Sequence, residues 1–393
     1  MHPSRTSGCF LPGRAESIMI KKPLVLLIAL STGFLISSCN FPYQPKQFVI
    51  PPPNYIFPSK TEMLNFIGNG GIHVKLAFTI KNSARDVYYI DYNDYNDSAF
   101  IPRKLKKPAG KENFHADSPL ISPDGSFVAY YLTAGATVNG AYIQRLDTSS
   151  SPVLIDANGT EPHWWQDNTG GIYIIYSNII FTQLGGLNQG VGQTFKRKVD
   201  LTGDGAITGP AQVLAPYPMN GGLSPDGNYL CTGYANAAFY GLFDASLIPI
   251  NQNNQTCNPS TDPDTVHRGR MMFLNFSGIQ NMSNTFIGNA DFPDSFVLEH
   301  TVLYIVDYTN TVRDYVTLGQ LNAAYGGYIE WQDPEWSNNP QFAAALGVID
   351  DAQADGIIIK NVGDPASKKA FLKFTLGKGK LDVTSTPYIW IGK

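Results

Sequence analysis

The sequence predicts an all-β fold built from repeated sheets, and three observations carry this prediction. The 393 residues are 43% apolar and only 15% charged, so the chain can bury a large core. Glycine, proline, tyrosine and phenylalanine are abundant, which favours short strands joined by turns over long helices. A drifted repeat, a turn followed by a strand, recurs from about residue 65 to the end of the chain.

Four copies of the repeat align without gaps over eight residues, starting at Pro119, Pro162, Gly221 and Pro334. Two copies keep a full Ser-Pro-Asp-Gly turn, at 122–125 and 224–227. Proline presets φ and glycine accepts a positive φ, so these turns should join the strands of a hairpin. Aromatic and small residues then recur two apart, as one face of a strand requires. These pairs are Phe127 and Ala129, Tyr229 and Cys231, and Phe342 and Ala344.

The spacing of the copies indicates how many units there are. Successive copies lie 43, 59 and 113 residues apart, and the last interval leaves room for one more copy near 271–278. The stretch 74–80 is the counterpart of 127–132 and adds a sixth unit ahead of them. Periods of about 40–60 residues are typical of a β-propeller, in which four-stranded blades close into a ring. We therefore predict six four-stranded blades, with seven as the alternative.

The consensus of these copies resembles the TolB-type propeller repeat, which occurs in periplasmic TolB and in the propeller domains of some peptidases. The resemblance implies a TolB-like propeller domain over residues 61–393. It leaves the activity open, because propellers host both binding proteins and enzymes.

The first 38 residues predict a targeting segment. Residues 19–22 form a basic head, and the apolar run at 24–36 is too short to span a bilayer but suits a signal peptide. Ile-Ser-Ser-Cys at 36–39 resembles the lipobox of bacterial lipoproteins, which implies a lipoprotein signal peptide at 19–38 and lipidation of Cys39. An ordinary secretory signal with a chance cysteine is the alternative. Residues 1–18 are then an upstream extension from a misassigned start, or an unusually long basic leader.

Residues 39–60 are predicted to be a lipidated, proline-rich tether. Several acyl chains anchor a protein stably where one chain is marginal. The prolines favour an extended stalk of about 3.1 Å per residue, the alternative being a disordered leader. Asn40 replaces the aspartate associated with inner-membrane retention, so the resemblance implies the outer membrane of the cell envelope, on its periplasmic or its surface face.

Charge and motifs narrow the possible partners. Without residues 1–38 the chain has 24 basic and 31 acidic residues, a net charge of −7, which argues against a nucleic acid partner. No Gly-x-Ser-x-Gly elbow and no His-Glu-x-x-His zinc motif is present. We expect no cofactor. The expected partners are the membrane, through the lipid, and an envelope protein or glycan.

Polar residues just ahead of the repeat cores are the candidate ligand site. Asp117, Glu161 and Asp333 precede three copies, and Asn220 stands at the matching point of the fourth. If each leads into an innermost strand, the four side chains converge at one mouth of the propeller channel. There they could bind a cation, an amine or a sugar, or they could cap strand ends as structural groups.

Three further features have structural and functional interpretations. The tryptophans at 164, 165, 331 and 336 could stack on sugars, but repeated strand positions favour core between blades. Asp200, Thr202 and Asp204 resemble the opening of a calcium loop, yet Ala211 replaces its final glutamate, which makes this a weak metal candidate. Cys231 and Cys257 could form a disulfide. Because Cys231 aligns with Ala129 and Ala344, we favour a buried thiol.

Two functions follow from these observations. The first is a non-enzymatic envelope lipoprotein whose propeller is a binding scaffold for a protein or glycan. The alternative is a carbohydrate-active propeller that uses carboxylates at the channel mouth.

Overall fold

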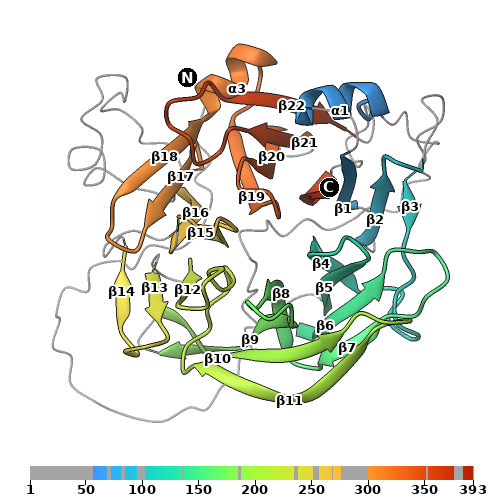
Figure 1. Cartoon of the computed structure of the whole chain (residues 1–393), viewed down its shortest axis with the longest axis vertical. Helices are drawn as coiled ribbons and strands as arrows, with labels where there is room; N and C mark the ends of the chain where they lie inside the picture. The colour runs from blue at the N-terminus through green and yellow to red at the C-terminus, as the bar shows by residue number, and fades with distance from the viewer. Residues whose placement is uncertain are drawn as a thin grey trace, which may run out of the picture.

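A computed structural model describes residues 56–68, 72–80, 85–94, 102–134, 137–184, 187–233, 238–250, 256–267, 269–275, 300–350, 353–375 and 384–392. The predicted extension, the signal peptide with Cys39 and most of the tether lie outside these residues. Six antiparallel blades surround one axis, so the fold is the six-bladed β-propeller that the sequence predicted, and the seven-bladed alternative is wrong (Figure 1).

The first three blades follow one another around the ring. Blade 1 has the strand order β23-β1-β2-β3, formed by Thr384–Gly392, His73–Ile80, Asp86–Asp91 and Arg103–Lys104. Blade 2 has the order β4 to β7, formed by His115–Ile121, Phe127–Ala134, Thr137–Arg145 and Val153–Asp156. Blade 3 has the order β8 to β11, formed by Gly159–Gln166, Ile172–Leu184, Leu187–Asp200 and Ala206–Ala215.

The other three blades complete the ring. Blade 4 contains β12 to β14, formed by Tyr229–Thr232, Ala238–Gly241 and Leu247–Pro249. Its innermost strand is the segment 219–224, which pairs with β12 through the bridge between Leu223 and Leu230. Blade 5 contains β15 to β18, formed by Thr256–Thr261, Arg270–Asn275, Val302–Asp307 and Val312–Thr317. Blade 6 contains β19 to β22, formed by Glu330–Trp336, Phe342–Asp350, Gln353–Lys360 and Ala370–Phe374.

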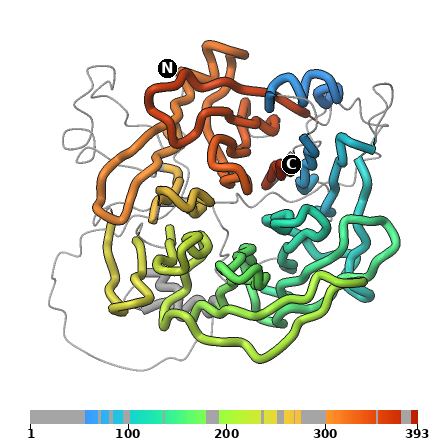
Figure 2. Tube along the Cα trace, viewed as in Figure 1, coloured from blue at the N-terminus to red at the C-terminus, as the bar shows by residue number. Residues whose placement is uncertain are grey.

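The ring closes by pairing the two ends of the domain. The last strand, β23, is the innermost strand of blade 1 and runs antiparallel to β1, with Ala77 opposite Tyr388 (Figure 2). Blade 1 therefore forms only when the two ends of the propeller meet, because its innermost strand comes from the C-terminal end and its other three from the N-terminal end.

The Ser-Pro-Asp-Gly turns form as predicted, as the connection between the first two strands of a blade. In blade 2 the Ser122 hydroxyl accepts a bond from the Phe127 amide at 2.9 Å, and the Gly125 amide donates to the Ser122 carbonyl. In blade 4 Ser224 makes the same two contacts, with Tyr229 and Gly227. Both glycines have a positive φ, which a side chain would strain.

The strands that follow these turns contribute buried side chains to the hydrophobic core. Phe127, Phe342, Ala129, Cys231 and Ala344 are buried as predicted. Tyr229 occupies the position equivalent to Phe127 and Phe342, but it is only half-buried and stacks on Tyr308. Cys231 is a free, buried thiol, which confirms the preferred interpretation, whereas the Cys257 side chain lies outside the described part. Two of the predicted core tryptophans, Trp331 and Trp336, are fully buried.

Helix α1 (Lys60–Ile67) joins the start of the domain to its end. Ile56 forms a backbone bridge with Thr375, just after β22, and Met63 and Ile67 pack in one core cluster with residues of blades 1 and 6. The Lys360 ammonium donates to the Phe66 carbonyl at 2.7 Å, at the C-terminal end of the helix, where a cation is favourable. A second helix, α3 (Leu318–Ala324), connects β18 to β19.

No helix in the described residues is long and apolar enough to cross a membrane.

Candidate functional site

The innermost strand contains a β-bulge in five of the six blades, and the sequence explains where it falls. In five blades an X-Pro pair interrupts the strand, and since proline has no N–H to give to the ladder, the pairing slips by a residue there. The residue before proline has a positive φ in all five: Ser118, Glu161, Asn258, Asp333 and Thr386. Blade 4 has no proline at this point. Asn220 stands there instead, followed by two glycines, and the positive φ falls on the second of them, Gly222, at 89°.

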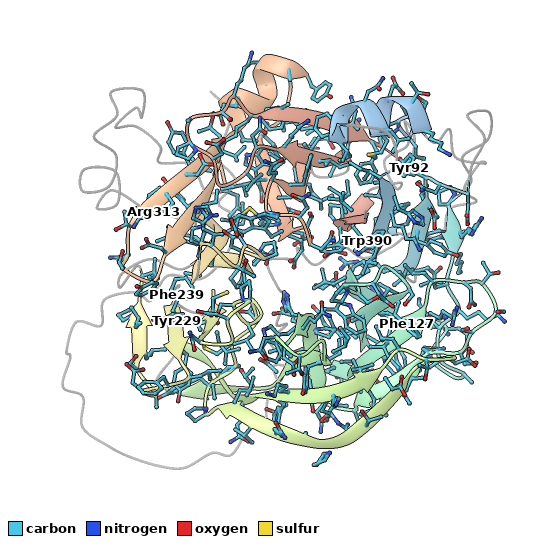
Figure 3. The ribbon with its side chains drawn as sticks, viewed as in Figure 1. Tyr92, Phe127, Tyr229, Phe239, Arg313 and Trp390 are labelled. Atoms are coloured by element: carbon cyan, nitrogen blue, oxygen red, sulfur yellow. The ribbon has the colours of Figure 1, made fainter. Side chains whose placement is uncertain are left out.

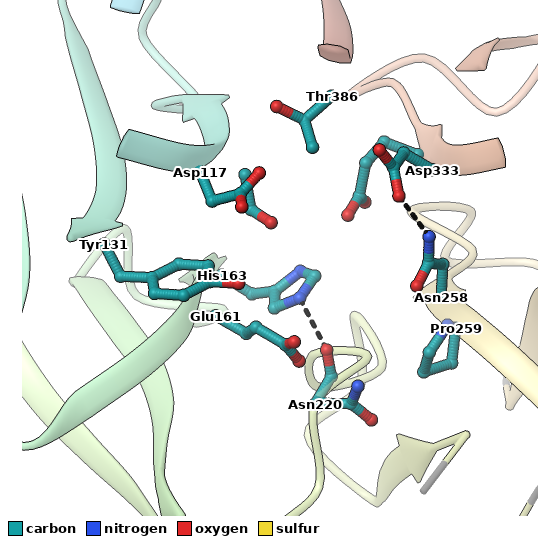
Figure 4. Close-up of a pocket in the computed structure, with 11 residues that line it drawn as sticks. Asp117, Tyr131, Glu161, His163, Asn220, Asn258, Pro259, Asp333 and Thr386 are labelled. Atoms are coloured by element: carbon teal, nitrogen blue, oxygen red, sulfur yellow. Dashed lines mark hydrogen bonds between the residues drawn. The ribbon is translucent and has the colours of Figure 1, made fainter. Parts of the chain in front are cut away.

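These six residues, one from each blade, line one cavity at the propeller axis, and we call them the axial ring; Figure 4 labels all of them except Ser118. They line a cavity of about 30 Å³, the axial cavity. Five neighbours complete its wall: Asp117, Tyr131, His163, Pro259 and Glu335. Local backbone chemistry, an X-Pro pair in five blades and an Asn-Gly-Gly segment in the sixth, thus builds one polar site from segments far apart in sequence.

All four residues that the sequence proposed as a ligand site line this cavity. Their role in binding stays a prediction. Asp117 does not share the repeat position of the others, because Ser118 occupies it in blade 2. Asp117 instead forms a buried ion pair with Arg85, at 2.8 Å, and so contributes little net charge.

The sequence reasoning missed the ring members Ser118, Asn258 and Thr386. The sequence nevertheless marks these three residues, because each stands immediately before a proline in an innermost strand. It also missed His163 and Glu335, which lie two residues after a ring member. The β-bulge falls between the ring member and this residue in both blades, so regular alternation of side chains does not predict that it faces the cavity.

Burial and neighbouring charges shift the pKa values of two ionisable groups in the cavity wall. Burial, together with the negative charges of Glu161 and Asp333, raises the pKa of Glu335 to about 8, although a hydrogen bond with Ser260 opposes this shift. Burial lowers the pKa of His163 to about 4. At neutral pH Glu335 is therefore mostly protonated and His163 is neutral.

Hydrogen bonds hold several ring members in place. The Asn258 amide donates to Asp333, and the neutral His163 ring donates from Nε2 to the Asn220 carbonyl at 2.9 Å (Figure 4). The Asn220 side-chain oxygen accepts from the Thr232 hydroxyl at 3.0 Å and from the Gly233 amide. These contacts fix the positions of the polar groups before any ligand arrives.

The weak metal candidate has a structural explanation. Asp200 accepts the Thr202 amide in the turn between β10 and β11, and Asp204 accepts the Ser150 hydroxyl of blade 2. Among the described residues, no three histidine, cysteine, aspartate or glutamate side chains are placed to hold a metal ion.

Comparisons with known proteins give structural similarity alone. No protein-family model matches the chain, and no curated protein matches its sequence. TolB from Acinetobacter baumannii is 13% identical, with a TM-score of 0.49, over 80% of this chain and 66% of that protein. A putative TolB from Agrobacterium tumefaciens is 11% identical, with a TM-score of 0.42, over 83% and 99% of the two chains.

A periplasmic gluconolactonase from Pseudomonas aeruginosa is similar to a comparable degree, at 12% identity and a TM-score of 0.39 over 82% of this chain and 99% of that protein. Identities and scores at this level assign no function to the chain.

Proposed function

We propose that the protein is a lipid-anchored envelope protein whose propeller is a binding scaffold, and that its axial cavity receives a primary ammonium group of a protein partner. The observation that supports this most is the axial ring, an acidic, preorganised site to which every blade contributes. A lysine side chain or a free amino terminus supplies the ammonium.

The charges in the cavity favour a cation. Arg85 neutralises Asp117, burial keeps a proton on Glu335, and His163 is neutral. Glu161 and Asp333 are the other two carboxylates of the wall, and the described lining contains no lysine or arginine. An ammonium placed between them would gain charge-assisted hydrogen bonds and would relieve carboxylate repulsion.

The cavity volume separates the proposed function from the alternative. One observation favours a glycosidase, since a protonated Glu335 beside the charged Glu161 is the pairing such enzymes use. The volume argues against it, because about 30 Å³ holds two or three water molecules, whereas ligand pockets for ring-sized molecules have roughly 300 Å³ or more. An ammonium group fits this space and a sugar ring does not.

The position of the first described residues supports attachment at the rim. Ile56 pairs with Thr375 and α1 lies on the outer side of blades 1 and 6, away from the axis (Figure 1). A tether that begins at a lipidated Cys39 and arrives here would leave the axial cavity accessible to a partner.

Calorimetry with the tripeptide amide Gly-Gly-Lys tests the ligand, with its fully acetylated form as the chemical control. We expect the free amines to bind, acetylation to abolish binding, and Glu161→Gln with Asp333→Asn to weaken it about tenfold or more. The matched control is Glu112→Gln with Asp350→Asn, two exposed carboxylates outside the cavity. Equal affinity in both double variants contradicts the proposal.

Detergent-phase partitioning tests the anchor. Cys39→Ala should move the protein to the aqueous phase and leave the propeller folded, because the lipid lies outside the domain. A variant that stays in the detergent phase rules out lipidation at this residue.

A further inference from the structure

A second depression lies between the turns of blades 3 and 4, and we call it the turn groove. Its volume is about 520 Å³, against about 30 Å³ for the axial cavity. It lies where the turn after β8 faces the Ser-Pro-Asp-Gly turn of blade 4. Its lining combines one indole, two carboxylates, two carboxamides and a hydroxyl.

The indole of Trp165 is fixed from three sides. Its Nε1 donates to the Ser224 carbonyl of blade 4 at 3.0 Å, and its ring packs beside Gly227, where an added Cβ would lie 3.1 Å away. Tyr173 contacts the ring at 5.4 Å between centroids, and the Lys196 ammonium lies 5.2 Å from its centre. The groove therefore has a rigid aromatic wall.

The polar groups of the groove fall into two sets. On the floor, Asp226 is held by the Ser224 hydroxyl at 2.6 Å and by the backbone and side-chain amides of Asn228. At the rim, Asn168 and Thr265 are exposed, and neither side chain makes a hydrogen bond within the described residues. The floor is preorganised, and the rim keeps its hydrogen-bonding capacity for a ligand.

We propose that the turn groove binds a neutral saccharide ring. An aromatic face accepts the C–H face of a sugar, while carboxylates, carboxamides and hydroxyls pair with its hydroxyl groups. The volume lies in the range of small-molecule sites, about 300–1,000 Å³. Asp167 and Asp226 disfavour an anionic ligand, and Lys196 already occupies the cation site on the Trp165 ring.

This inference is independent of the proposed ammonium site, because the two cavities share no lining residue. It gives the envelope scaffold a glycan contact without requiring hydrolysis. A glycan and a protein partner would be held at separate places on the same propeller.

The test uses the full chain in a detergent without a sugar headgroup, screened on an array of neutral glycans and titrated with maltotriose and N-acetylchitotriose. We expect Trp165→Leu to weaken saccharide binding about tenfold, and the double change Asn168→Ala with Thr265→Ala to weaken it about threefold or more. The rim variant changes two exposed side chains and removes no hydrogen bond within the described residues, so it keeps the test valid if Trp165→Leu unfolds the protein.

Trp390→Leu is the matched control. Trp390 packs on Gly125 of blade 2 as Trp165 does on Gly227, and its Nε1 donates to the Pro123 carbonyl, but it does not line the groove. Its saccharide affinity should stay within about twofold of the unmodified chain, and Gly-Gly-Lys amide binding should be unchanged in all three variants. Absence of binding to every neutral glycan, or an unaffected rim variant, or an equal loss in Trp390→Leu overturns the proposal.

Discussion

Blades 2 and 4 carry the same Ser-Pro-Asp-Gly turn with the same hydrogen bonds, yet their surroundings differ. In blade 2 the indole of Trp390 presses against the turn, so that a Cβ on Gly125 would meet it at 2.5 Å. In blade 4 the indole of Trp165 stands farther off, at 3.1 Å from the same position on Gly227, and the turn groove opens beside it. Figure 3 labels Phe127 and Tyr229, the aromatic residues that follow the two turns.

The difference shows that the turn sequence determines the hairpin but not how the turn packs against the preceding blade. The preceding blade supplies Tyr388 and Trp390 at one junction and His163 and Trp165 at the matching positions of the other. Both turns meet a tryptophan, but the second aromatic residue is Tyr388 at blade 2 and the smaller His163 at blade 4. The same motif therefore occurs at a closed junction in blade 2 and beside an open groove in blade 4.

Truncation of the aromatic residue after each turn should give the largest contrast. Phe127 is fully buried, so Phe127→Ala should reduce the free energy of unfolding by about 3–5 kcal/mol. Tyr229 is half-buried, so Tyr229→Ala should cost about half as much. Chemical denaturation measures both, and equal losses would mean that the two blades are packed alike.

Acid should weaken the junction of blades 3 and 4. The folded pKa of His163 is about 4, below its ordinary value of 6.5, so the unfolded chain binds more protons between these values. Stability should fall as the pH drops from 6.5 to 4, by about 3 kcal/mol at most from this residue. His163→Gln keeps a donor for the Asn220 carbonyl and should remove this part of the pH dependence.

The comparison of unfolding curves across this range, with and without the substitution, isolates His163 from the other ionisable groups. Parallel pH profiles in the two proteins would show that the histidine ring is not the titrating group.

Alanine at the two turn glycines should reveal the tighter junction. Gly125 and Gly227 have φ of 75° and 74°, so both substitutions should lose about 1 kcal/mol to backbone strain. Gly125→Ala should lose about 1–3 kcal/mol more, because its methyl group would overlap the Trp390 ring. A larger loss at Gly227 in thermal denaturation would reverse the assignment of closed and open junctions.

The smallest change in stability is expected for a substitution at Cys231 of blade 4, the position that Ala129 occupies in blade 2. Both positions are buried, and burial raises the pKa of the Cys231 thiol to about 12. Cys231→Ala should change stability by less than about 1 kcal/mol, and the thiol should resist alkylation until the protein unfolds. Rapid modification of the native protein at Cys231, located by peptide mapping, would contradict this.

Elements with local causes could be predicted from the sequence alone. The turn at 122–125 predicts its hairpin because proline and glycine set φ, and alternation from Phe127 to Ala129 predicts a buried strand because side chains point to opposite faces. The repeat alignment assigned Glu161 and Asp333 to one channel mouth, and the X-Pro pairs that contain them place the bulges that build the axial ring.

The sizes of the two cavities and the packing of each junction depend instead on the tertiary structure. Trp390 reaches the turn of blade 2 across 267 residues, and Trp165 reaches that of blade 4 across 59. Whether such contacts seal a gap depends on tenths of an ångström between side chains from different blades. Local sequence cannot specify those distances, because ring closure fixes the positions of all six blades together.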